Sequence, residues 1–179
     1  MVGKLEIMAP AGSFECLYAA LQGGADSVYF GVEKLNMRSH SANNFKLSDL
    51  PEVCRICREA GVKSYLTLNI ILYEDDLEDA RKTLDAAKEA GITAVIASDM
   101  AAIMYARRIG LEVHISTQLS ISNAEALKFY AQWADVIVLA RELTLDQVGE
   151  IHEAIVRESI CGPSGKPVRI EMFAHGALC

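Results

Sequence analysis

Residues 23–30, GGADSVYF, contain the junction that decides the fold. A pair of glycines follows a helical segment, and a short run rich in apolar residues comes next. A similar sequence pattern occurs at residues 60–66 (AGVKSYL), 90–96 (AGITAVI) and 109–115 (IGLEVHI), and it occurs without the glycine at 133–138 (WADVIV). Glycine after a helix supplies the left-handed conformation that ends it. The short apolar run is typical of a buried strand, so strands and helices are expected to alternate.

The pattern predicts a regular series of strands and helices. Strands are expected at 5–9, 26–31, 63–71, 92–97, 112–117, 135–140 and 168–174, and helices at 13–23, 48–60, 75–90, 99–109, 122–132 and 144–158. The helix starts carry residues that suit N-caps or first turns. They are Ser13 with Glu15, Ser48 with Asp49, Asp99, and Thr144 with Gln147, a pair that resembles a capping box.

Strict alternation implies a parallel sheet with helices outside it. An open doubly wound sheet usually has a glycine-rich phosphate loop after its first strand, and residues 9–13 (APAGS) do not match that loop. Polar residues instead follow the ends of many strands, which favours a barrel. We therefore expect an α/β fold of the (β/α)8 TIM-barrel type, incomplete because about seven strands and six helices are predicted.

The length of 179 residues is short for such a barrel, which typically needs about 250 residues. The sequence also stops after an apolar stretch, at residues 175–179 (HGALC). We expect residues 1–179 to be the N-terminal barrel domain of a longer protein, cut within a motif. The unclosed strand edges of such a domain invite self-association.

Composition excludes several classes of protein. The chain is 51% hydrophobic and 23% charged, so it can build a core and is not disordered. Its net charge of −7 argues against a non-specific nucleic-acid binder. The sequence contains no apolar run of about 20 residues and no signal peptide, so we expect a cytoplasmic protein without a membrane partner.

In a barrel the active site lies at the carboxyl ends of the strands. Arg141 follows the run 135–140 directly and would suit a carboxylate clamp; a structural ion pair with Glu142 or Glu171 is the alternative. Asn69 is notable because an amide is costly to bury without partners. The candidate polar residues at strand ends are Arg38, Asn43, Asn69, Ser116, Gln118, Arg141, Glu142, Glu171 and His175.

Other polar residues have simpler structural explanations. Asp99 is expected to cap a helix, and His114 lies inside a strand and is expected in the core. Glu171 alternates with Arg169 and Phe173, which places the three on one side of a strand. This arrangement would suit either an ion pair in the barrel interior or a solvated strand edge.

The five cysteines do not suggest a disulfide framework, because their number is odd. Cys54 and Cys57 form a CxxC inside a predicted helix, where core packing explains the spacing better than redox or metal chemistry does. Cys16 is also expected in the core, and Cys161 at the surface of a Gly/Pro loop. Cys179 closes a predicted strand end, and alone it cannot hold an iron–sulfur cluster, which needs about four cysteines.

The ordered set of motifs resembles the collagenase-like peptidase family of unknown catalytic type (peptidase family U), over nearly all of the chain. The last motif is similar to the first half of the family's signature, which continues to a second cysteine in complete members. The matching runs are 8–13 (MAPAGS), 24–31 (GADSVYFG), Arg38 with 42–45 (ANNF), 113–118 (VHISTQ) with Asn123, 138–143 (VLAREL) and 171–179 (EMFAHGALC).

The family name implies proteolysis of collagen. The sequence, however, has no serine or cysteine credibly paired with a histidine base and a third residue that orients the histidine, and it has no HExxH motif. Relatives are iron–sulfur proteins implicated in oxygen-independent hydroxylation of transfer RNA, ribosomal RNA or ubiquinone precursors, some with prephenate as oxygen donor. The resemblance implies a 4Fe-4S cluster in the longer protein, with Cys179 as its first ligand and the others downstream. The chain by itself is then expected to bind no cluster and to be inactive.

Three functions stay open at this point. The favoured one is a cluster-dependent, RNA-modifying hydroxylase with a small carboxylate donor; the others are a peptidase and a small-acid-binding barrel without catalysis. The expected partners are a small carboxylate, RNA for the longer protein, and a second copy of the chain. The expected site comprises catalytic Arg141, Glu142 and His175, substrate-binding Arg38, Asn43, Asn69, Ser116, Gln118 and Glu171, and the metal ligand Cys179.

Overall fold

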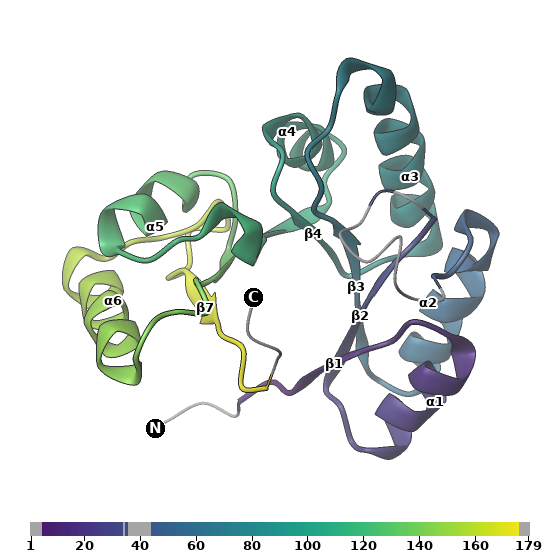
Figure 1. Ribbon diagram of the computed structural model, residues 1–179, viewed down its shortest axis with the longest axis horizontal. Coiled ribbons are helices and arrows are strands. Elements are labelled where there is room, and N and C mark those ends of the chain that lie inside the picture. The colour runs from purple at the N-terminus through teal and green to yellow at the C-terminus, as the bar shows by residue number, and fades with distance from the viewer. Residues whose placement is uncertain (1–4, 34, 36–43, 176–179) are drawn as a thin grey trace. The chain divides into compact units, whose positions relative to one another are not determined.

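A computed structural model describes residues 5–33, 35 and 44–175 (Figure 1). The predicted residues Arg38, Asn43 and Cys179 lie outside these ranges. Seven parallel strands and six α-helices alternate along the described part of the chain, which confirms the predicted α/β class. The chain divides into two compact units, residues 1–111 and 112–179.

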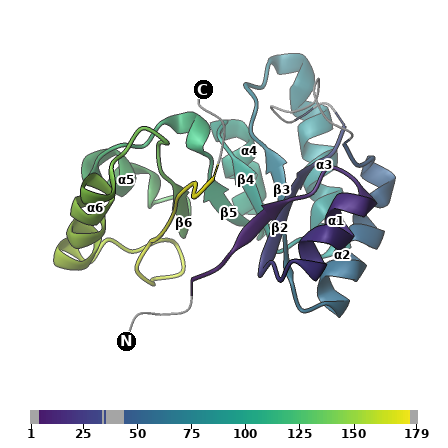
Figure 2. The same ribbon diagram turned by 60° about the horizontal axis from the view of Figure 1, so that its bottom comes forward.

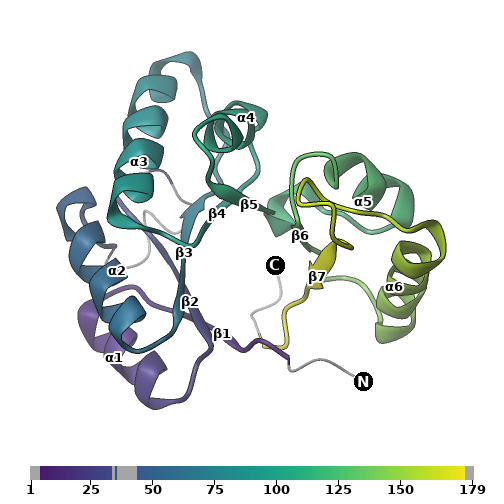
Figure 3. The ribbon, with the colours of Figure 1, turned by 180° about the vertical axis from the view of Figure 1, so that it is seen from behind.

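Four strands of the N-terminal unit pair in chain order, all parallel. The order has no reversal, whereas a doubly wound sheet needs one, so this unit follows the barrel pattern. Figure 1 and Figure 3 show its helices along one face of the strands. The elements are β1 (Met8–Pro10), α1 (Phe14–Gln22), β2 (Ser27–Gly31), α2 (Leu50–Glu59), β3 (Lys63–Leu68), α3 (Leu77–Ala90), β4 (Ala94–Ala97) and α4 (Met100–Arg108).

Both faces of this four-stranded sheet are buried. Because side chains alternate between the two faces of a strand, Val28, Leu66 and Val95 all lie on the face that the helices cover. Each of the three is 0% exposed. On the opposite face, Met8 and Tyr29 pack against a cluster that contains Tyr65, Ala94 and Ile96. Burial on two faces explains why the strand sequences are nearly continuous apolar runs.

The C-terminal unit continues the same pattern with parallel strands in chain order. Figure 2 shows its two helices on one side of the strands. The core of this unit comes from Ile115 and Ile137 in the strands and Leu127 in the first helix, all 0% exposed. The elements are β5 (Glu112–Ile115), η3 (Thr117–Leu119), α5 (Ala124–Tyr130), β6 (Val136–Val138), α6 (Leu145–Glu158) and β7 (Arg169–Glu171).

The predicted helix caps are largely confirmed. Ser13 Oγ accepts from the backbone N–H of Cys16, and Asp99 Oδ1 accepts from that of Ala101. Thr144 and Gln147 form the complete capping box of α6. Two of the expected first helical turns are short 3-10 turns instead. The turn η1 (Leu47–Asp49) precedes α2, and the turn η2 (Glu74–Asp76) precedes α3.

Several local predictions are wrong. The seventh strand ends at Glu171 rather than at residue 174. The first strand begins at Met8 rather than at residue 5, because the backbone of Ile7 hydrogen-bonds the side chain and N–H of Asp26 and leaves the Ile7 side chain 65% exposed. The third strand ends at Leu68 rather than at residue 71. Cys16 is exposed, since the buried position of α1 is the next residue, Leu17.

No helix among the described residues is both long enough and apolar enough to cross a membrane.

Candidate functional site

The carboxyl ends of β6 and β7 bring together an arginine and an aromatic ring. Arg141 follows β6 and Phe173 follows β7, and the Arg141 Cζ lies 4.5 Å from the centroid of the Phe173 ring. Arg141 is exposed and Phe173 is half-buried. Stacking on an aromatic ring orients the plane of a guanidinium group, and a guanidinium group recognises carboxylates through donors in that plane.

Backbone hydrogen bonds hold the segment that leads to Arg141. The N–H of Leu139 donates to the carbonyl oxygen of Glu171 at 2.9 Å, and its carbonyl accepts from Thr117 Oγ1 at 3.1 Å. The N–H of Ala140 donates to the carbonyl oxygen of Ile121 at 2.9 Å. The approach to Arg141 is therefore fixed from both neighbouring strand ends.

A row of charged residues is formed by side chains of β5 and β7. Arg169 Nη2 lies 2.7 Å from Glu112 Oε1, and His114 Nε2 lies 3.4 Å from the same oxygen. On the other side of the imidazole, His114 Nδ1 is 3.9 Å from Glu171 Oε2. Arg169 is thus in an ion pair with Glu112, and its side chain is 53% exposed.

His114 is the buried centre of this row. Its prediction as a core histidine is confirmed, because only 2% of the residue is exposed. Sequence reasoning missed that two carboxylates would flank it. The His114 imidazole, above all, lowers the pKa of Glu112; partial burial opposes this shift, and Arg169 adds to it.

The other predicted site residues differ in how far they are exposed to solvent. Ser116 is buried, and its Oγ accepts from the backbone N–H of Gln118, so one of its roles is to cap the turn η3. Gln118, Glu142 and His175 are exposed. Asn69 is half-buried and directly follows β3 in the N-terminal unit.

The N-terminal unit carries its own polar cluster, at the amino end of its strands. Glu6 accepts hydrogen bonds from Lys63 Nζ at 2.5 Å and from the Tyr65 hydroxyl at 2.6 Å. Partial burial raises the pKa of Glu6, but hydrogen bonds from Lys63, Tyr65 and Ser27 outweigh it and lower the pKa overall. In barrels the amino ends of strands serve stability rather than chemistry.

The cysteine predictions for α2 are confirmed. Cys54 and Cys57 are buried in its apolar face, and burial raises the pKa of both thiols, for Cys57 to about 11. Cys161 is exposed, as expected. No group of three or more His, Cys, Asp or Glu in the described ranges could hold a metal ion.

Comparison with known proteins identifies the family. Residues 12–179 match the family described as peptidase family U32. The chain belongs to peptidase family U32. Its sequence is 65% identical over 178 residues to a collagenase of Porphyromonas gingivalis, covering 99% of this chain and 43% of that protein.

Other relatives of this U32 chain have names that refer to RNA. A tRNA hydroxylation protein of Bacillus subtilis is 34% identical, covering 98% of this chain and 40% of that protein. A 23S rRNA 5-hydroxycytidine synthase of Escherichia coli is 36% identical, and the match covers 98% of this chain and 25% of that protein. The chain thus spans less than half the length of these curated relatives.

A solved structure confirms the barrel-type fold. The structure of a U32 peptidase superposes with a TM-score of 0.70 at 17% identity, covering 86% of this chain and 67% of that one. Within the U32 chain, Phe173 is the site residue that sequence reasoning did not assign. The alternation of Arg169, Glu171 and Phe173 was the available signal, but it gave no reason to pair the ring with Arg141.

Proposed function

We propose that this chain is the barrel part of an RNA-hydroxylating enzyme in which Arg141 binds a small carboxylate donor such as prephenate. The observation that carries the proposal is the stacking of the Arg141 guanidinium on Phe173, at the strand ends where barrel enzymes bind substrates. Arginine recognises carboxylates through paired N–H donors in one plane. An aromatic ring beneath that plane orients the donors and offers apolar contact to a ring-bearing acid.

The neighbouring residues have supporting roles in this proposal. Glu171 lies in β7, and its backbone carbonyl holds Leu139 in the segment before Arg141. Glu142 and His175 are both exposed. Each follows β6 or β7 closely in the sequence, and we assign the two residues to proton transfer. Asn69, Ser116 and Gln118, together with Arg38 and Asn43, remain our candidates for substrate contacts.

The RNA substrate is inferred from the relatives named for tRNA and rRNA hydroxylation. With a net charge of −7, this chain offers few cations to neutralise phosphates. We therefore assign most RNA contacts to other parts of a longer protein, which would act in the cytoplasm.

A 4Fe-4S cluster would supply redox chemistry to such a hydroxylase. The described residues do not fit a cluster site, since Cys54 and Cys57 are buried with raised pKa values and Cys16 and Cys161 lie apart in sequence on different elements. Cys179 stays the predicted ligand of a cluster completed from outside this chain. No step of the proposal depends on it.

A peptidase is the second candidate, because a collagenase-named relative is 65% identical to this chain. Nucleophilic cysteines in peptidases need a lowered pKa. The burial-raised pKa values of Cys54 and Cys57 are the opposite of that requirement. A small-acid-binding barrel without catalysis remains the third candidate, and it shares the Arg141 site.

The carboxylate site is tested by isothermal titration of prephenate into the full chain. Replacing Arg141 by Ala should weaken binding at least about tenfold, because a bidentate ion pair is lost. Arg141→Lys should weaken it nearly as much, since an ammonium group lacks the planar donors. Arg157→Ala, which removes an exposed arginine of α6, is the matched control. Equal affinity of wild type and Arg141→Ala would contradict the proposal.

The reaction class is tested with the longer protein that contains this chain. Nucleoside mass spectrometry should detect a hydroxylated RNA nucleoside that disappears when the gene is deleted and returns with the wild-type gene but not with Arg141→Ala. Gelatin cleavage by the purified protein is measured in parallel. Unchanged RNA nucleosides together with gelatin cleavage would favour the peptidase instead.

A further inference from the structure

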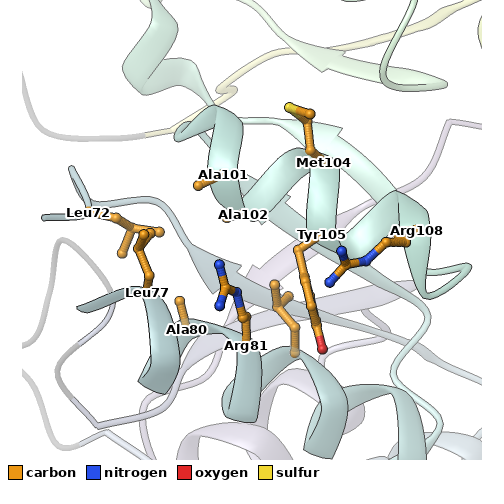
Figure 4. A pocket seen from close by; sticks show the side chains of 10 residues that line it. Leu72, Leu77, Ala80, Arg81, Ala101, Ala102, Met104, Tyr105 and Arg108 are labelled. Atoms are coloured by element: carbon orange, nitrogen blue, oxygen red, sulfur yellow. The ribbon is translucent and has the colours of Figure 1, made fainter. Parts of the chain in front are cut away.

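A groove of about 230 Å³ lies between α3 and α4 of the N-terminal unit (Figure 4). Its floor is apolar and closely packed. Ala80, Leu84 and Ala102 line it and are 3%, 0% and 2% exposed. The alanines leave room above the floor that larger side chains would have filled.

Half-buried and exposed apolar side chains border this groove. Leu72, Leu77 and Met104 line it, and Met104 is 55% exposed. Beside Leu72 in the same loop, Ile71 and Tyr73 are 73% and 72% exposed. Such a concentration of exposed large apolar residues is characteristic of an interaction surface rather than of ordinary exposed side chains.

Asp99 fixes the two segments that flank one end of the groove. Its Oδ1 accepts from the N–H of Ala101 at 2.8 Å, and its Oδ2 accepts from the N–H of Leu72 at 3.3 Å. One carboxylate therefore ties the loop after β3 to the first turn of α4. The groove is held in shape before any partner arrives, which lowers the entropy cost of binding.

The charged residues of the groove are arginines. Figure 4 shows Arg81 of α3 and Arg108 of α4 extending toward the space between the helices. Arg108 Cζ lies 4.6 Å from the centroid of the Tyr105 ring. Among the described residues, neither guanidinium lies within ion-pair distance of a carboxylate, and Arg81 makes only a minor contribution to the lowered pKa of Glu78, which Lys82 dominates.

The carboxylates nearby are engaged with other groups. Glu78 and Asp79 of α3 pair with Lys82 at 2.7 and 3.6 Å. Asp85 accepts from the Tyr105 hydroxyl at 2.9 Å. The residues that line the groove include these two arginines and no carboxylate, so the lining itself offers positive charge to an incoming ligand.

We propose that this groove docks a short acidic, amphipathic peptide segment of a partner protein. One large apolar side chain of the peptide fills the space above Ala80 and Ala102, and flanking carboxylates pair with Arg81 and Arg108. A volume of about 230 Å³ is below the roughly 300–1,000 Å³ of sites that enclose small ligands. It suits a side-chain anchor of the helix-in-groove kind. This inference does not rest on the proposed function.

The test is fluorescence anisotropy of the full chain with a fluorescein-labelled helical peptide of leucines and glutamates. The wild type should bind this peptide, and a peptide with lysines in place of the glutamates should bind at least about tenfold more weakly. The double variant Arg81→Glu/Arg108→Glu should lose at least about tenfold in affinity for the acidic peptide. Ala101→Phe, which fills the groove without a charge change, should weaken it as well.

Lys82→Glu is the matched control, because Lys82 is next to Arg81 but pairs with carboxylates outside the groove. It should change the affinity by less than about threefold. Circular dichroism checks that each variant is folded. Equal binding of acidic and basic peptides, or no effect of the double variant, would overturn the proposal. Displacement of the bound peptide by a lower concentration of dodecanoate than of unlabelled peptide would also overturn it, because the groove would then bind a fatty acid. A dimer of this chain that the double variant dissociates would overturn it as well, because a second copy would then be the occupant.

Discussion

At the scale of single residues, the sequence located polar groups but not their partners. Arg141 was placed at a strand end, yet its stacking on Phe173 depends on how far β6 and β7 are shifted along each other. Glu112 was not selected at all, although it contacts both Arg169 and His114. Such contacts depend on strand register, which a single sequence specifies only indirectly.

Glu112 also gives a prediction for pH dependence. Its pKa is lowered below the ordinary value of 4.5 in the folded state, above all by His114. A depressed carboxyl pKa stabilises the fold above the ordinary value, and this contribution is lost as the pH falls through the folded value. Thermal unfolding followed by circular dichroism should therefore show that Glu112→Gln lowers Tm at pH 7 by about 2 °C. The difference from wild type should shrink as the pH is lowered below 4.5.

Glu153→Gln is the control for this experiment, since Glu153 is exposed on α6. It should leave both Tm and its pH dependence unchanged. A pH-independent difference between Glu112→Gln and wild type would show that packing, rather than the charge of Glu112, stabilises the row.

At the scale of elements, sequence patterns predicted the helices better than the strand ends. Caps such as Ser13 and Thr144 act on backbone groups within three residues, so the local sequence contains both partners. The end of β3 is different, because Leu72 is held by Asp99, 27 positions away. The side of α1 that faces solvent was also misjudged at Cys16, since one position on a helix decides between burial and exposure.

Helix α2 gives a prediction about thiol reactivity. Cys54 and Cys57 lie in its buried face, and burial raises the pKa of Cys57 to about 11. Alkylation of the native chain by iodoacetamide at pH 8, followed by peptide mass spectrometry, should modify Cys16 and Cys161. The α2 thiols should react at least about tenfold more slowly, because the thiolate is the reactive form.

Alkylation in denaturant serves as the control, and all five thiols of the chain should then react. Rapid modification of Cys54 or Cys57 in the native chain would contradict the core assignment and reopen a redox role for the CxxC.

At the scale of the whole molecule, each unit repeats the same β/α pattern, and each has a strand with a single neighbour among the described strands. In the N-terminal unit this strand is β1, which pairs with β2 alone. Beside it, Leu5 and Ile7 are 81% and 65% exposed. An exposed strand edge with apolar neighbours is a template for pairing with another chain.

We therefore expect the chain to self-associate as its concentration rises. Light scattering coupled to size exclusion should give a molar mass that increases between about 10 μM and about 500 μM. Ile7→Lys should reduce the association, because a charge next to β1 disfavours edge pairing. Leu145→Lys, at the start of α6, is the matched control, because Leu145 is also exposed, at 74%. A mass that does not depend on concentration would contradict this expectation.

The sequence by itself determined the order of the elements, the α/β class and the helix caps. Each of these depends on residues within a few positions of one another, through glycine conformation, apolar runs and side-chain caps. The tertiary structure decided which distant side chains meet: Arg169 with Glu112, 57 positions apart, Arg141 with Phe173, and α3 with α4 at the arginine-lined groove. These contacts follow from strand register and helix packing, which arise only when many weak long-range interactions form together.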